Sequence, residues 1–111
     1  MKKLVVFLAV LLMFASTVIA AETFPVTNLS VQFESMIGMT TIQGEITNNS
    51  GKSYNGCVFK MSFYDDNDKL IGTADVSVMN FNKGETVTFD SFSDKDLRKA
   101  TKYKIRLDAG Y

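Results

Sequence analysis

The chain has 111 residues, with 12 basic and 12 acidic side chains and neither histidine nor tryptophan. Without histidine there is no imidazole to activate a serine or cysteine nucleophile, and the commonest nitrogen ligand of zinc is missing. This length suits one domain rather than two, and the balanced charge argues against a dedicated nucleic-acid-binding protein.

The amino-terminal residues have the pattern of a signal peptide. Lys2-Lys3 precede an apolar run over residues 4–15, and Ala20 is a small residue where signal peptidase would cut. A retained membrane anchor is the alternative, but the run is shorter than the roughly 20 residues of a spanning helix. We therefore expect residues 1–20 to be removed. Residues 21–111 would then form a single domain that is secreted or held in the periplasm or cell envelope, without a stable membrane span.

From residue 26 onward, apolar and polar side chains alternate, and turn residues separate the alternating runs. The predicted strands are built on Leu29–Phe33, Ile42–Ile46, Cys57–Phe63, Leu70–Val78, Val87–Phe89 and Tyr103–Leu107. Each run places its apolar residues on one face, so each strand would bury one side. Six such strands predict an all-β fold, a two-sheet antiparallel β-sandwich of immunoglobulin or fibronectin type III type.

Two features of the carboxy-terminal part need separate interpretation. Asp94–Ala100 is the only helical candidate, with about two turns at most. Leu97 is followed six residues later by Tyr103 at the start of a strand. This pattern resembles a tyrosine corner, in which the phenol bonds back to the chain that enters the strand. An ordinary core aromatic is the alternative for Tyr103.

The acidic segment Asp65–Asp68 contains side chains that suit calcium. A calcium loop counted from Asp65 would need Asp or Asn at position 69 and glycine at position 70, where the chain has Lys69 and Leu70. Asp and Asn also favour turns, because their side chains bond to nearby backbone. We therefore predict a hairpin turn and no metal site.

Cys57 is the only cysteine, so it cannot form a disulfide within the chain. A lone exported cysteine can be a reactive thiol or an intermolecular bridge. Cys57 has the parity of Phe59, however, which places it on the core side of its strand. We therefore predict that it packs as a small, inert apolar residue.

Several of these stretches together resemble the FxLYD family of secreted prokaryotic domains. The matching stretches are Gly44–Ser50, Tyr54, Phe59–Asp65, Leu70–Gly72, Lys83–Thr86 and Phe89. They cover most of the chain after residue 20, although Met61 and Phe63 stand where the family name has Phe and Leu. The resemblance implies an immunoglobulin-like sandwich of mostly unknown function, with no established catalytic residues.

Parity also predicts a basic sheet face, because the strand of Ile105 should join the hairpin formed by the strands of Phe63 and Leu70. The solvent side of that sheet would carry Lys60, Tyr64, Lys102, Lys104 and Arg106, opposed only by Asp75, while the other sheet would show Glu34, Glu45 and Asp90. Such a basic face would suit an anionic envelope polymer or an acidic protein partner. The alternative is that these are merely solvated charges. The last strand would also be an open edge for a donated strand, unless its lysines protect it.

These observations favour a non-enzymatic interaction or structural module of the cell envelope or extracellular space. The alternative is a secreted inhibitor or ligand-binding domain that uses the loops at the end of the sandwich. Carboxylate-only catalysis needs a deep cleft, for which a domain of this size has little room. We expect no cofactor and no nucleic-acid partner, and the sequence leaves the oligomeric state open.

Overall fold

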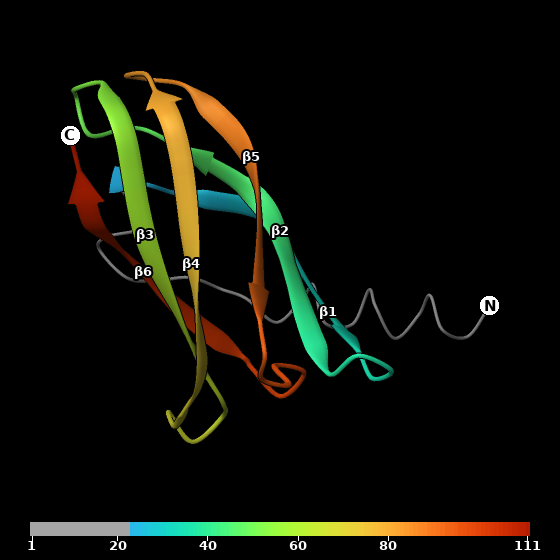
Figure 1. Cartoon of the computed structure of the whole chain (residues 1–111). Helices are drawn as coiled ribbons and strands as arrows, with labels where there is room; N and C mark the ends of the chain where they lie inside the picture. Colours follow the sequence, from blue (N-terminus) through green and yellow to red (C-terminus); the bar gives the residue numbers. More distant parts are fainter. Residues whose placement is uncertain (1–22) are drawn as a thin grey trace.

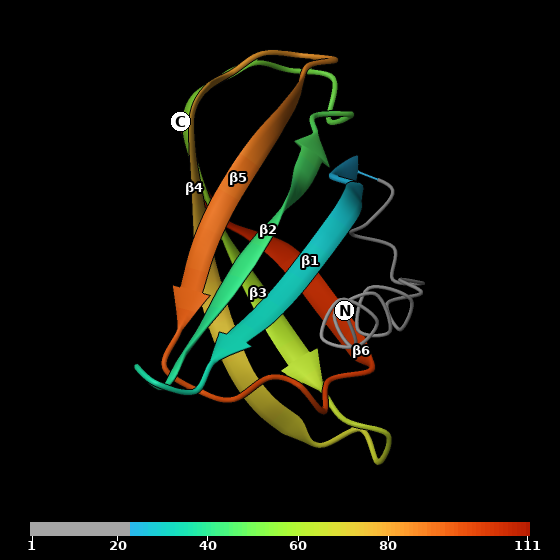
Figure 2. The same ribbon diagram turned by 90° about the vertical axis from the view of Figure 1, so that its right-hand side faces the viewer.

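The computed structural model describes residues 23–111 as two antiparallel three-stranded sheets, so the predicted signal peptide lies outside the described residues (Figure 1). The strands are β1 (Val26–Glu34), β2 (Met39–Thr47), β3 (Tyr54–Tyr64), β4 (Leu70–Phe81), β5 (Thr86–Ser93) and β6 (Lys102–Gly110). One sheet has the order β1-β2-β5 and the other the order β4-β3-β6. Figure 2 shows the first sheet lying over the second. The predicted all-β sandwich of six strands is confirmed.

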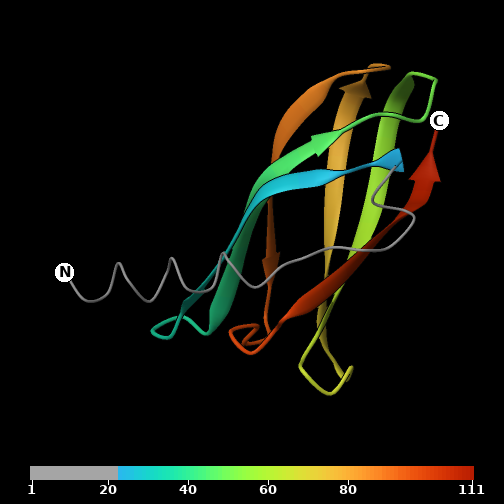
Figure 3. The ribbon, with the colours of Figure 1, turned by 180° about the vertical axis from the view of Figure 1, so that it is seen from behind.

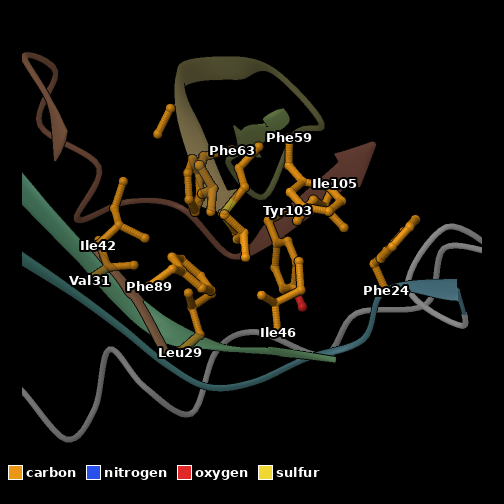
Figure 4. Close-up of a cluster of buried hydrophobic side chains, with 14 of the residues drawn as sticks. Phe24, Leu29, Val31, Ile42, Ile46, Phe59, Phe63, Phe89, Tyr103 and Ile105 are labelled. Atoms are coloured by element: carbon orange, nitrogen blue, oxygen red, sulfur yellow. The ribbon is translucent and has the colours of Figure 1, made fainter. Parts of the chain in front are cut away.

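The core lies between the sheets, because each strand turns its apolar residues inward. Figure 4 shows side chains of both sheets meeting there, and Phe59 and Phe63 of β3 are completely buried. Phe24, just before β1, packs edge-on against Phe59 with ring centroids 4.9 Å apart. Tyr103 is buried with its ring centroid 6.4 Å from that of Phe63. The hydrogen bond of a tyrosine corner at Tyr103 stays a prediction.

The two long sides of the sandwich differ. On the side of β4 and β5, the Ser91 hydroxyl of β5 donates a hydrogen bond to the Asp75 carbonyl oxygen of β4, which joins the two sheets. On the other side, β1 pairs with β2 and β6 with β3, and the described residues place no further strand on either. Within residues 23–111, no helix is long and apolar enough to cross a membrane.

The start of β4 differs from the sequence prediction. Leu70 was expected on the core side with Gly72, but its side chain is 51% exposed. The register shifts at this point: Phe63 pairs with Gly72, whereas Tyr64 pairs with Leu70. Ile71 is therefore an extra residue in β4, and it packs against the core in place of Leu70. A bulge of this kind reverses the parity of every residue beyond it.

The helix expected over Asp94–Ala100 is absent, and this segment is an irregular loop. The Ser93 hydroxyl and the Asp96 carboxylate each accept a hydrogen bond from a backbone N–H two residues further on, at 3.1 and 3.0 Å. Such local bonds compete with those of a helix. Leu97 is also completely buried between the sheets, which anchors the middle of the loop.

Two glycines near the carboxy-terminal end of β6 lie under aromatic rings. A side chain at Gly56 would meet the Tyr111 ring at 2.8–3.2 Å, and one at Gly110 would meet the Tyr54 ring at 2.9–3.0 Å. The backbone of Tyr111 also pairs with that of Gly56, with N–O distances of 3.0 and 3.2 Å. The ends of β3 and β6 therefore meet through reciprocal ring contacts, in which a tyrosine on one side covers a glycine on the other.

A buried amide organises the opposite end of the sandwich from the β1–β2 hairpin. Asn48, directly after β2, donates to the carbonyl oxygens of Lys52 (2.9 Å) and Phe81 (3.1 Å). Its Oδ1 accepts from the backbone N–H and the hydroxyl of Ser50, at 3.0 and 2.6 Å. Its backbone N–H donates to the Glu85 carbonyl oxygen at 2.9 Å. One side chain thus joins the β2–β3 loop to the end of β4.

Asn48→Ala should lower the free energy of unfolding by about 2–4 kcal/mol, because the buried Phe81 carbonyl and its neighbours lose their donor. Urea denaturation measures this loss. Asn49→Ala is the control, since the Asn49 side chain is exposed, and it should change stability by no more than about 0.5 kcal/mol. A cost below about 1 kcal/mol for Asn48→Ala would show that water replaces the amide.

Candidate functional site

The five residues predicted to form a basic face do lie on the outer side of one sheet. Lys60 of β3 pairs with Arg106 of β6, and Tyr64 pairs with Lys102 at the other end of the stretch. Lys104 lies between them on β6. The alternating residues of both strands are buried, so these side chains point to solvent. We call the set Lys60, Tyr64, Lys102, Lys104 and Arg106 the basic face.

Lys104 occupies the middle of this face. Its ammonium lies over the ring of Tyr64, 5.3 Å from the ring centroid. An ammonium in this position is attracted by the electrons of the ring face. Among residues 23–111, no carboxylate forms an ion pair with Lys104. Its charge is therefore available to an external anion.

The other three cations have carboxylate partners, which corrects the prediction that only Asp75 opposes them. The pairs are Lys60 with Asp75 at 3.3 Å, Lys102 with Asp68, and Arg106 with Asp108 at 3.6 Å. Asp68 reaches the face from the β3–β4 turn, and Asp108 shares the outward parity of Arg106. One cation is left in excess. Exposed pairs of this kind contribute about 0–1 kcal/mol and exchange partners readily.

The opposite sheet carries the expected carboxylates, but neutral donors already bind two of them. The Glu45 carboxylate accepts from the Asn28 side chain at 2.8 Å, and Asp90 accepts from Gln43 at 3.0 Å. An open hollow of about 380 Å³ lies among these four side chains. Asn28 reaches it from a bulge in β1, where its backbone is left-handed with φ 54°. Strand alternation alone gives no signal of such a bulge, so sequence reasoning missed this hollow.

The predicted hairpin turn at Asp65–Asp68 is confirmed. Asp65 Oδ1 accepts the backbone N–H groups of Lys69 (3.0 Å) and Asn67 (2.9 Å). These bonds, that of Lys69 foremost, hold the pKa of Asp65 below its usual value. The carboxylate is therefore occupied as a turn acceptor. Within residues 23–111, no group of three or more acidic, cysteine or histidine side chains could hold a metal ion.

Exposed apolar side chains lie at both ends of the sandwich: Met79 and Tyr111 near the start of β3, and another group at the end that carries the β1–β2 hairpin tip. There, the β1–β2 hairpin lies beside the β3–β4 turn and the β5–β6 loop (Figure 1). Met36 and Ile37 at the hairpin tip are 94% and 68% exposed, and Phe92 near the end of β5 is 59% exposed. The Arg98 guanidinium lies 4.6 Å from the ring centroid of Phe33, which ties the β5–β6 loop to β1.

No family model matches the chain, and no curated protein matches it. A DUF1425 family member from Shewanella is 18% identical, with a TM-score of 0.45 over 79% of each chain. β-Glucosidase 3B from Thermotoga neapolitana is 14% identical, with a TM-score of 0.47 over 77% of this chain and 16% of the glucosidase. A Campylobacter jejuni protein is 9% identical, with a TM-score of 0.42 over 86% of this chain and 95% of that one. These similarities assign the chain to no family.

Cys57 provides a direct test of the strand register, because the structure buries it as predicted, with 2% of its surface exposed. Burial also raises the pKa of its thiol. A thiol reagent should therefore label Cys57 only after denaturation. Cys57→Ser should cost roughly 1–3 kcal/mol of stability, because it buries a poorly satisfied hydroxyl, and Cys57→Ala should cost less. Rapid labelling of the native protein would contradict the register.

Proposed function

We propose that this chain is an exported, non-enzymatic interaction domain of the cell envelope. In this proposal it is an FxLYD-type sandwich, cleaved near Ala20, whose basic face binds an anionic envelope polymer. The observation that carries the proposal is the row of cations on β6, with Lys104 free of any carboxylate partner in the described part of the chain.

The spacing of the cations supports an extended polymer as ligand. Lys102, Lys104 and Arg106 are alternate residues of one strand, so their backbone positions repeat at roughly 6.6–6.8 Å. A flexible polymer with one negative charge per repeat can place successive charges beside these three cations, and this contact does not require a concave pocket. The exposed carboxylates beside the row are weak competitors, because surface ion pairs contribute little. Several cations that act on one polymer add their attractions.

The chemistry available to the chain supports a binding role rather than catalysis. The chain has no histidine, and carboxylate catalysis needs an acid whose pKa is raised by burial in a cleft. Asp75 and Asp90, on the two outer faces, are exposed and lie on opposite sheets. Asp90 lines the hollow together with Glu45, but this hollow is open to solvent, and both carboxylates already accept hydrogen bonds from neutral amides.

The charged face is tested by sedimentation with purified envelope. Binding should weaken steeply with added salt, and the double change Lys102→Glu and Lys104→Glu should abolish it. Reversal of Glu34 and Glu45 to lysine should leave it unchanged. A change at Lys102 also breaks its ion pair with Asp68, so Lys104→Glu alone tests the contribution of an unpaired cation more directly. Lys83→Glu in the β4–β5 turn is the matched control, because it makes the same charge change away from the basic face.

Two results would count against this proposal. Binding that is absent, or indifferent to both salt and the two lysines, would contradict the charged face. Binding that disappears when the envelope is first treated with protease would identify an acidic protein, and not a polymer, as the ligand.

The exposed apolar side chains at the β1–β2 hairpin tip favour the second candidate, a secreted inhibitor or ligand-binding domain. Two adjacent apolar side chains, Met36 and Ile37, project from a hairpin tip in which the left-handed Gly38 (φ 67°) closes the turn. The backbone carbonyl oxygen of Glu34 accepts the Gly38 N–H at 2.8 Å, which closes this turn. A projecting apolar tip of this kind suits insertion into a pocket of another protein.

A protease panel separates the two candidates. If the charged-face proposal holds, the protein should inhibit no member of the panel. Stoichiometric inhibition would establish the second candidate if Met36→Ser with Ile37→Ser removed it and Lys104→Glu did not. The paired serine variant is suitable because both side chains are exposed, so the change should alter stability by no more than about 0.5 kcal/mol.

A further inference from the structure

On the long side of the sandwich formed by β1 and β6, each of these two strands has one edge that pairs with no other described strand, and the edge of β6 borders the basic face. β6 pairs with β3 over its whole length, and the described residues place no strand on its other side (Figure 3). In an antiparallel strand, every second residue turns its N–H and C=O groups away from its neighbour, and no other described strand pairs with this edge of β6. The edge of β4 is different, because Ser91 of β5 donates to the Asp75 carbonyl there.

The apolar side chains beside this edge are incompletely covered. Leu107 on the inner side of β6, Val26 on β1 and Tyr54 on β3 are only partly buried, although all three pack against the core. Figure 2 shows β1 and β6 on the same long side of the sandwich. A strand added to β6 would turn alternate side chains inward over Leu107. Those side chains should therefore be apolar.

The outward side chains of an added strand would lie next to the basic face. Opposite charges on neighbouring strands contribute roughly 0.2–1 kcal/mol per pair, and like charges destabilise. Acidic residues in the alternate positions would therefore complement Lys102, Lys104 and Arg106. The regular part of the edge ends near Leu107, because the β3–β6 register shifts between Val58 and Phe59. Six regular residues are enough for a strand of ordinary length.

Self-pairing satisfies these conditions less well. If two copies of β6 paired antiparallel about Lys104, Lys104 would lie opposite its own copy, and Lys102 of each copy would lie opposite Arg106 of the other. Like charges directly opposite one another are unfavourable. The charge pattern of β6 thus favours a different, acidic partner.

We propose that β6 accepts an extended acidic segment of a partner protein, which adds as a fourth strand to the β4-β3-β6 sheet. The segment alternates acidic residues, which face Lys102, Lys104 and Arg106, with apolar residues, which cover Leu107. This inference does not rest on polymer binding, because it depends on backbone hydrogen bonds at the edge and not on charge alone.

The test uses three fluorescent synthetic peptides and the purified protein. The first alternates glutamate and valine, the second alternates lysine and valine, and the third is the first with N-methyl groups on alternate residues. Fluorescence anisotropy should show binding of the first peptide alone, because the third keeps its charge but loses the edge hydrogen bonds. Amide hydrogen exchange should show new protection within residues 102–107. Lys104→Glu should weaken binding roughly tenfold, and Lys83→Glu should not change it.

Failure of this inference can be told apart from failure of polymer binding. The inference is overturned if the acidic peptide does not bind, if the N-methylated peptide binds equally well, or if the protection lies outside β6. It is also overturned if sedimentation shows a dimer that the acidic peptide does not dissociate, since the edge would then be occupied by a second copy. Salt-sensitive envelope binding would survive each of these results.

Discussion

The fold depends on two completely buried polar side chains that hold the loops at its two ends. Asn48 satisfies carbonyl oxygens of the β2–β3 loop and of β4 at one end. At the other end, the Thr40 hydroxyl donates to the Lys95 carbonyl oxygen at 2.6 Å. With no disulfide within the chain, these bonds and the aromatic core must fix the sheets against one another. The loss of the Asn48 side chain would leave the buried Phe81 carbonyl without its donor, which is costly in an apolar interior.

The position of β6 follows from this arrangement and determines what the domain can present to other molecules. Leu97 in the β5–β6 loop is completely buried, and β6, which follows this loop, pairs with β3. That pairing places Lys104 over Tyr64 and leaves the other edge of the strand open. The basic face and the open edge are thus two properties of one strand. The basic face can attract an anionic polymer by its charge, and the open edge can form backbone hydrogen bonds with an extended segment of a partner protein.

Alternation of apolar residues was enough to predict the six strands and the burial of Cys57. The β3–β4 hairpin was predicted from its short acidic turn, and the place of β6 from an immunoglobulin-like strand order. Alternation failed wherever local geometry departs from a strict period of two. The exposure of Leu70 depends on a bulge opposite Tyr64, which is a property of the pairing and not of either strand alone. The loop around Leu97 resembles a helix in composition, but side-chain acceptors take its amides. Strand alternation could not predict that the β3–β4 turn brings Asp68 to Lys102, because this contact depends on the three-dimensional path of the turn. The predicted basic face therefore carried more net positive charge than the observed one.

The reciprocal ring contacts between β3 and β6 have a consequence for how such a sequence can diverge. Gly56 lies under Tyr111, and Gly110 lies under Tyr54, at distances that leave no room for a methyl group. A side chain at Gly110 would meet ring atoms of the partly buried Tyr54, whereas one at Gly56 would meet the hydroxyl end of Tyr111, an exposed side chain that can rotate away. A substitution becomes tolerable only after the facing tyrosine has shrunk or moved. In an alignment of descendants of this chain, Gly110 and Tyr54 should therefore change together more strictly than Gly56 and Tyr111.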